Sequence, residues 1–390
     1  MEFTITDEQS AFRKSVLNFS KKEIEPMMEE YEKKSEFCRP AWNKLAEFGI
    51  MGLPFPEEYG GAGAGVLTTC LGMEALAEGG ASEGLTLSWG AHSILCGIPI
   101  WLLGTEEQRQ KYLTKLISAE WIGGFGLTEP NAGSDAASLK TTAVKKGDKY
   151  ILNGSKMFIT NGPIGNVFVV IAVTNKDAGH FGISAFIVES EFPGFSVGKE
   201  LDKMGHRTST TSELIFEDCE VPAENLIGQE GMGFVMVGKT TLEWERTCLL
   251  AAGIGSIQHA LDESVRYSQE RHQFNRPICK FPAIQHKLAD MKMLVEGSRM
   301  ALYRAAWMKD QGIPAMLEAS ICKLFMSESG LKICDNAVQI HGGYGYMREY
   351  PVERHYRDTK LGTIGAGTSE VQRQIISKMI LNPKKAKGGK

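Results

Sequence analysis

The residues of this 390-residue sequence that are best suited to binding a ligand lie in three segments that mix glycine with small polar side chains. Glycine lets the backbone come close to a ligand, and free N–H groups and hydroxyls can then converge on a phosphate or a ring edge. The segments are FGLTEPNAGSDAASLK (125–140), QIHGGYGY (339–346) and IGAGTSEVQR (364–373). A polar loop between domains is the structural alternative for the first, and a helix C-terminus is the alternative for the second.

The sequence contains none of the common short catalytic motifs. We find no GxGxxG after a strand, no P-loop, no GxSxG and no HExxH. His92 and Cys96 have the i,i+4 spacing of one helix face, but no further cluster of metal ligands accompanies them. We therefore predict a core or pocket-wall role for these two residues, and no metal site.

Length and composition limit the possible function classes. A chain of 390 residues is too long for one ordinary core, which predicts two or three domains. The fractions of hydrophobic (43%) and charged (23%) residues are those of an ordinary soluble globular protein, and the net charge of −4 gives no reason to expect nucleic acid as a partner. The start of the chain is acidic and no 18-residue apolar run is evident, so we expect neither a signal peptide nor insertion into a membrane. Eight scattered cysteines without a CxxC pair favour free thiols in the cytoplasm.

Local patterns predict an α, then β, then α order. The first helix is expected after Thr6, which with Gln9 forms a capping-box pattern. Helical spacing continues to about residue 118, and short β-branched or aromatic runs separated by Gly, Asn and Asp follow. Long helical spacing then returns and suggests an antiparallel bundle. We predict a helical domain (1–118), a β domain (119–230) and a helical bundle (231–390).

Five motifs occur together in one order, and they resemble those of flavin-dependent acyl-CoA dehydrogenases over nearly the whole chain. They are GLTEPNAGSD, ERHQFNRPI, QIHGGYGY, YRD and GTSEVQR. The resemblance implies an α+β fold with an N-terminal α-helical domain, a middle β-barrel-like domain and a C-terminal four-helix bundle. It also implies FAD as the cofactor and a homotetramer in which each FAD contacts a neighbouring subunit.

The same resemblance implies which residues bind FAD. Those expected to line the flavin are Phe125, Leu127, Thr128, Gly133 and Ser134, with Phe158 and Thr160 flanking the isoalloxazine. Those expected to reach the FAD of a neighbouring subunit are Arg271 and Phe274, and those expected on the adenine side are Gln339, Gly342, Gly343, Thr368 and Glu370. The chain departs from the family at Phe281-Pro282, where members often have Phe-Gln. Because proline has no side-chain amide, one FAD contact is missing unless Gln285 replaces it.

The family resemblance also bears on the catalytic base. Many members carry a carboxylate base in a Tyr-Glu-Gly-Thr loop, where this chain has Gly365-Ala366-Gly367-Thr368. Members of the isovaleryl-CoA dehydrogenase type share the Gly-Ala-Gly-Thr loop and carry the base in a helix, immediately before an arginine. The matching residue is Glu245, followed by Arg246, with Glu243 as the lesser candidate. A solvated helix face is the usual explanation of such a Glu-Arg pair, but the flanking residues here are apolar.

The implied mechanism begins when Glu245 removes the α-proton of a saturated acyl thioester, while a hydride leaves the β-carbon for the flavin. The backbone N–H of Ala366 would then stabilise the negative charge on the thioester oxygen, and a donor of this kind can contribute about 3 kcal/mol. The residues expected to contact the substrate are Ser134, Trp244, Arg246, Gly365 and Gly367. Gly365 in place of tyrosine leaves space for a branched or cyclic acyl group. Trp244 is either a pocket wall or ordinary core packing.

The carrier and the electron acceptor stay open. Coenzyme A is the default of the family, but LEWERTCLLAA and YRAAWMKDQG also resemble dehydrogenases of acyl or prolyl groups tethered to a carrier protein. We place coenzyme A first, because the net charge indicates no basic surface for an acidic carrier protein. The acceptor is either electron-transfer flavoprotein or oxygen. A catalytically inactive flavoprotein scaffold is the alternative from another class, since alanine at position 366 cannot act as a base.

Overall fold

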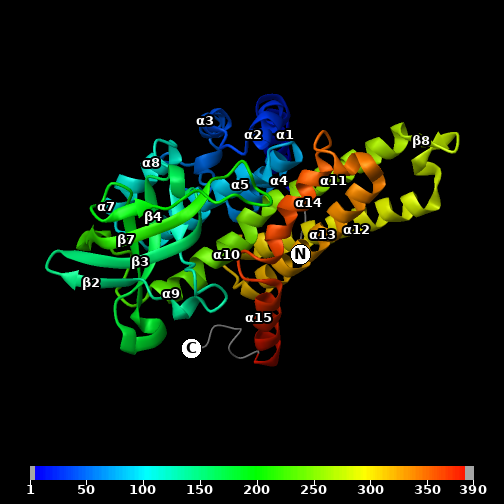
Figure 1. Ribbon diagram of the computed structural model, residues 1–390. Coiled ribbons are helices and arrows are strands. Elements are labelled where there is room, and N and C mark those ends of the chain that lie inside the picture. Colours follow the sequence, from blue (N-terminus) through cyan, green and yellow to red (C-terminus); the bar gives the residue numbers. More distant parts are fainter. Residues whose placement is uncertain (1–4, 383–390) are drawn as a thin grey trace.

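The computed structural model describes residues 5–382, in which a twisted sheet is followed by long helices that extend away from it (Figure 1). The order of elements is helices, strands, helices, as the sequence pattern predicts. Figure 1 shows the sheet at one end of the molecule, the short strand β8 at the other, and α10 between them.

The N-terminal part is helical, and its first helix begins at the predicted cap. The Thr6 side chain accepts a hydrogen bond from the Gln9 N–H, and the Gln9 side chain accepts one from the Thr6 N–H, which completes the capping box. The helices are α1 (Asp7–Phe19), α2 (Glu25–Lys34), α3 (Arg39–Glu47), α4 (Val66–Glu78), α5 (Glu83–Trp89), α6 (Ile98–Leu103), α7 (Glu106–Gln108) and α8 (Thr114–Ile117). The π-helical turn η4 (Gly90–Gly97) joins α5 to α6.

The middle part is a seven-stranded sheet in the order β1-β4-β2-β3-β7-β6, with β5 paired to β4. Its strands are β1 (Gly123–Gly126), β2 (Thr142–Lys146), β3 (Lys149–Thr160), β4 (Val167–Val173), β5 (Ile183–Glu189), β6 (Phe195–Val197) and β7 (Thr211–Pro222). The pairs β1–β4 and β2–β4 are parallel, and the others are antiparallel.

The C-terminal part is built from long helices. They are α9 (Gly233–Met236), α10 (Leu242–Trp244), α11 (Leu250–Glu270), α12 (Pro282–Asp310), α13 (Met316–His341), α14 (Val352–Thr359) and α15 (Ser369–Leu381). The π-helical turns η10 (Val237–Thr241) and η11 (Glu245–Leu249) make residues 233–270 one almost continuous helical stretch. A two-stranded hairpin, β8 (His272–Gln273) and β9 (Arg276–Pro277), links α11 to α12.

Strand β4 explains how the sheet is attached to the helices. Val167, Val169 and Ile171 face the large core that the sheet shares with the N-terminal helices, whereas the residues between them face the interior of the β domain. A strand buried on both faces needs a continuous apolar sequence, and VFVVIAV is one.

One helical stretch, Glu83–Leu103, is long and apolar enough to cross a membrane by length and composition, with a mean hydropathy of 1.3. The sequence pattern did not predict such a stretch. Because 78% of its most apolar 18-residue segment is buried inside the protein, we assign this helical stretch to the core. The fold itself agrees with the prediction of a helical domain, a middle β domain and a C-terminal helical domain.

Candidate active site

Glu245 begins the π-helical turn η11, at the point where the long helical stretch 233–270 passes the loop that carries Ala366. The side chain is partly buried, while its neighbours Trp244 and Arg246 are buried. Burial raises the pKa of Glu245 to about 7, and the nearby charges of Arg246 and Lys323 oppose that increase. A carboxyl group with a pKa near neutrality can both accept and release a proton under ordinary conditions.

The loop at residues 364–368 is held by its carbonyl oxygens. The Ala366 oxygen accepts hydrogen bonds from Gln372 Nε2 at 2.9 Å and from Arg246 Nε at 3.3 Å. The Gly367 oxygen accepts one from Lys323 Nζ at 2.6 Å. By contrast, the Ala366 N–H donates to no acceptor within residues 5–382, so it is available to a ligand.

The backbone of this loop is unusual at two consecutive residues. Ala366 has a φ of 56° and Gly367 a φ of 85°, both in the left-handed region. A non-glycine residue there costs roughly 1–2 kcal/mol, so the hydrogen bonds to the two carbonyls must maintain the conformation. A Cβ on Gly367 would lie 2.9 Å from Gln372 Nε2. Gly365, in contrast, has no such restriction, and an added Cβ would meet only ordinary contacts with Leu361.

Glu243 and Trp244 are engaged on the other side of the helix. Glu243 forms an ion pair with Lys309 (3.1 Å), whose ammonium lies 5.4 Å from the centre of the Trp244 ring. Trp244 is 8% exposed and packs edge-to-face on Trp101 at 6.4 Å. Core packing therefore describes Trp244, and its ion pair makes Glu243 a poorer base than Glu245.

A buried ion pair fixes the loop that follows β1. Lys156 on β3 is completely buried, and its Nζ lies 2.7 Å from Glu129 Oε1 and 3.2 Å from the Leu127 oxygen. Glu129 also accepts hydrogen bonds from the N–H groups of Lys140 and Thr141. Burial lowers the pKa of Lys156 to about 8. Burial alone would raise the pKa of Glu129, but Lys156 and the N–H donors hold it below its ordinary value.

The expected flavin-lining residues of this loop lie around that ion pair. Phe125 and Leu127 pack against the main core, and the Thr128 oxygen accepts a hydrogen bond from the Met157 N–H at 2.8 Å. Gly133 and Ser134 are exposed, and an added Cβ on Gly133 would meet no atom within 4 Å. The loop therefore presents hydroxyl and N–H groups from a rigid base.

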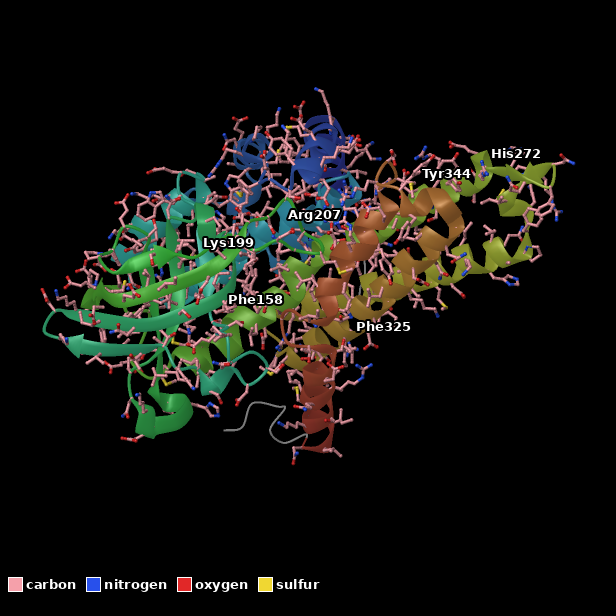
Figure 2. The ribbon with its side chains drawn as sticks, in the orientation of Figure 1. Phe158, Lys199, Arg207, His272, Phe325 and Tyr344 are labelled. Carbon is pink, nitrogen blue, oxygen red and sulfur yellow. The ribbon has the colours of Figure 1, made fainter. Side chains whose placement is uncertain are left out.

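Phe158 is positioned by a bulge in β3. The pairing with β7 shifts between Lys156 and Ile159, and Phe158 takes a left-handed φ of 62° that leaves its ring 65% exposed. Figure 2 shows it beside the sheet, and Thr160 ends the same strand. A strained aromatic residue that faces solvent is suited to covering a flat ring. With the hydroxyl-rich loop beside it, this region fits an isoalloxazine.

A second group of expected FAD residues lies at the far end of the molecule. Arg271, Gly342 and Gly343 line a cavity of about 460 Å³, and Phe274 nearby is 87% exposed. Gly342 ends α13, the helix that contains Gln339, so the C-cap expectation also applies. Tyr344 and His272 mark this end in Figure 2, far from Phe158. The 21 residues of α11 separate it from Glu245 by about 30 Å, at ~1.5 Å per residue.

Gln285 and Thr368 each stabilise the start of a helix. Gln285 Nε2 donates to the Cys279 oxygen at 3.0 Å and so braces the start of α12, which begins at Pro282. Thr368 caps α15, because its hydroxyl accepts a hydrogen bond from the Val371 N–H, and Glu370 lies exposed in the first turn. The adenine-side pair Thr368 and Glu370 is thus near Ala366, and not near Gly342.

Sequence patterns missed several residues that hold the site together. Lys156, Glu129 and Lys323 are buried polar residues whose partners lie 11 or more residues away, so no local spacing marks them. Gln372 bonds residues only five and six positions before it, but across a loop that has no regular spacing. His92, by contrast, is marked by its spacing in the sequence. Its Nδ1 accepts the Gly123 N–H at 3.0 Å and its Nε2 lies 2.9 Å from the Leu116 oxygen. Burial lowers the pKa of His92 to about 4, which agrees with the predicted core role.

Comparison with known proteins gives matches along the whole chain. Three family models match: the acyl-CoA dehydrogenase N-terminal domain (residues 6–120), middle domain (124–219) and C-terminal domain (231–381). A probable acyl-CoA dehydrogenase of Bacillus subtilis, YngJ, is 46% identical over 98% of this chain and 100% of its own. Mitochondrial isovaleryl-CoA dehydrogenase of Solanum tuberosum is 42% identical over 95% and 90%.

Solved structures match equally well. Butyryl-CoA dehydrogenase from Megasphaera elsdenii has a TM-score of 0.94 and 44% identity over 98% of this chain and 100% of its own. The prolyl acyl carrier protein oxidase AnaB has a TM-score of 0.94 and 40% identity over 97% and 100%. A chain from work on the electron transferring flavoprotein of Acidaminococcus fermentans has a TM-score of 0.95 and 46% identity over 98% and 100%.

The buried ion pair yields a test of the flavin loop. Lys156→Met leaves the Glu129 carboxylate buried without its cation, and breaking such a pair costs about 3–5 kcal/mol. We expect a lower melting temperature and loss of flavin during gel filtration, measured by the ratio of flavin to protein absorbance. Lys149→Met on the same strand is the control, because its ion pair with Glu220 is exposed and such pairs contribute at most about 1 kcal/mol. Equal flavin retention in both variants would contradict the assignment.

Proposed function

The chain belongs to the acyl-CoA dehydrogenase family, and on that premise we propose that it oxidises the Cα–Cβ bond of a short, branched or cyclic acyl-CoA with Glu245 as the base. It is an FAD-dependent oxidoreductase that acts on CH–CH bonds. When bound, FAD supplies the acceptor for the hydride that leaves the β-carbon. The relatives thus support an enzyme, and not the inactive scaffold that Ala366 alone suggested.

One observation carries the proposal. Arg246, the residue after Glu245 in η11, donates a hydrogen bond to the Ala366 oxygen, so the proposed base and the free Ala366 N–H lie on two segments in direct contact. In the proposed reaction, Glu245 takes the α-proton, which places negative charge on the thioester oxygen. We propose that the Ala366 N–H is the donor that meets this charge, because it has no acceptor among the described residues and its loop is held through the Ala366 oxygen by Arg246 and Gln372. A preorganised donor of this kind can contribute about 3 kcal/mol.

The proposed size of the acyl group rests on the open space beside Gly365. This residue is partly exposed next to the Ala366 N–H, and the space at its Cβ position is open apart from ordinary contacts with Leu361. We infer that this space accepts a branch or a ring on the acyl chain. We propose that Gly367 and Arg246 support the loop and that Ser134 contacts the substrate.

Coenzyme A is the proposed carrier, with an acyl carrier protein as the second candidate. Butyryl-CoA dehydrogenase supports the first and the prolyl carrier protein oxidase AnaB supports the second, at 44% and 40% identity. We propose electron-transfer flavoprotein as the acceptor, on the similarity to the Acidaminococcus chain, with oxygen as the alternative. We also propose a cytoplasmic location, because all eight cysteines are free thiols.

We propose a homotetramer, the assembly that the family resemblance implies. The residues expected to bind FAD lie in two separate places on the chain, which supports a cofactor shared between subunits. Figure 2 shows Phe158 beside the sheet and His272, the residue after Arg271, at the far end of the long helices. We therefore infer that one FAD contacts Phe158 and Arg271 only when the two residues come from different subunits. Exposed Phe274 and the cavity beside Arg271 would then face a neighbour's FAD.

The first test of this function removes the base. Glu245→Gln should keep the flavin but slow its bleaching by a saturated acyl-CoA by about 10³-fold, because an amide cannot accept the α-proton. In the unmodified protein, bleaching should become faster as the pH rises through about 7, since only the ionised carboxyl is a base. Stopped-flow absorbance measures both effects.

Glu243→Gln is the matched control for that test, because Glu243 is two residues away and paired with Lys309. It should leave the rate within a few-fold of normal. Normal bleaching in Glu245→Gln together with slow bleaching in Glu243→Gln would reverse the assignment of the base.

A second test concerns the acyl pocket. Gly365→Tyr adds a ring where we place the branch of the substrate, and overfilling such a site costs about 1–3 kcal/mol. Turnover of isovaleryl-CoA should fall roughly 10- to 100-fold relative to turnover of butyryl-CoA. An unchanged ratio of the two rates would exclude Gly365 from the pocket.

A third test concerns assembly. Arg271→Ala should weaken flavin retention and tetramer formation together, because a cofactor shared between subunits links the two equilibria. Light scattering gives the molar mass, and absorbance gives the flavin content. A monomeric variant with full flavin occupancy would show that Arg271 does not contact a neighbour's cofactor.

A further inference from the structure

Lys323 is a buried lysine on α13 whose ammonium contacts the loop that carries Ala366. Its side chain is completely buried, and Nζ donates a hydrogen bond of 2.6 Å to the Gly367 oxygen. Burial lowers the pKa of Lys323 to about 8, while Glu245 opposes that change. A buried cation costs several kcal/mol, so a lysine at this position needs a specific reason.

Backbone support alone does not account for the charge. The Gly367 oxygen already accepts a hydrogen bond from Gln372 Nε2 at 3.2 Å, and a neutral donor could provide a second one. The charge has a different partner, because Lys323 and Arg246 are the two cations that favour the ionised form of Glu245. Arg246 is influenced by both Glu245 and Glu243. The charge that most favours the Lys323 ammonium is that of Glu245, followed by Glu370 and Glu328, while Arg246 opposes it.

We propose that Lys323 is a positioning residue that couples the base to the loop: its buried ammonium holds the Gly367 carbonyl, beside the Ala366 carbonyl that Arg246 holds, and so fixes the loop that presents the Ala366 N–H while its charge favours ionised Glu245. This inference rests on the proposed function of Glu245. It explains how a carboxyl group that burial would otherwise keep protonated can act as a base near neutral pH. It also explains why the left-handed backbone of Ala366 persists.

The charge of Lys323 can be tested without hydride transfer. The holoenzyme is incubated in D2O with 3-thiabutyryl-CoA, in which sulfur replaces the β-carbon, so that only α-proton exchange occurs. Mass spectrometry gives the exchange rate as a function of pH. We expect Lys323→Met to move the midpoint upward by about one pH unit, because an opposite charge at close range lowers a carboxyl pKa by roughly that much or more. Exchange at pH 7 should fall severalfold and recover at higher pH.

The position of the loop is measured separately. Hydrogen exchange of the backbone amides in residues 361–372 should become faster in Lys323→Met, whereas Lys323→Arg should restore both the midpoint and the slow exchange. Lys203→Met is the matched control, because Lys203 also donates from Nζ to a backbone oxygen, that of Ser209 at 2.7 Å, but lies in the β domain. It should change neither property.

The outcomes separate the inference from the function. If Glu245→Gln still exchanges the α-protons, the proposed base is wrong. If Glu245→Gln is inactive but Lys323→Met keeps the normal midpoint and loop exchange, only the role of Lys323 is wrong. A rate that falls equally at every pH also contradicts it, since lost structure does not shift a midpoint. If Lys323→Met does not fold, Lys323→Gln decides, and its midpoint must move upward.

Discussion

Desolvation of the Glu245 carboxyl is the constraint on which the rest of the site depends. Burial raises its pKa to about 7, and without nearby cations it would stay protonated at higher pH still. Such a shift works against stability: the folded protein holds this proton more tightly than the unfolded chain, so the stabilisation present at low pH is lost as the pH rises toward 7. The protein accepts that cost and places Arg246 and Lys323 close by, which brings the pKa into the range where a base is useful.

The same two cations also reach the loop opposite, so electrostatics and geometry are not independent here. Arg246 and Lys323 donate to the Ala366 and Gly367 oxygens, and those bonds hold a left-handed alanine whose N–H is free. A loop without any acid or base of its own thereby gains a function from residues of three helices. An alanine in this loop is consistent with an active enzyme, because what the loop presents is backbone.

The β domain uses a comparable arrangement. Lys156 and Glu129 are buried together, and each also bonds the backbone of the flavin loop, so the pair fixes the loop against β3. The bulge after Lys156 then turns Phe158 outward. Buried ion pairs are poor sources of net stability, but they tolerate few alternative geometries, which suits a cofactor site.

The sequence by itself determined the α–β–α order and the capping box at Thr6, because each follows from spacing within a few residues. It also pointed to Glu245, through a motif that compensates for Ala366. It did not indicate Lys323, Gln372, Glu129 or Lys156 as partners, and it did not mark residues 83–103 as a long apolar helix. Lysine and glutamate are surface residues in most sequences, and only the tertiary structure decides which of them are buried. The left-handed backbone of Ala366, the bulge at Phe158 and the burial that raises the pKa of Glu245 likewise depend on how segments distant in sequence or on different strands pack together, which local patterns do not encode.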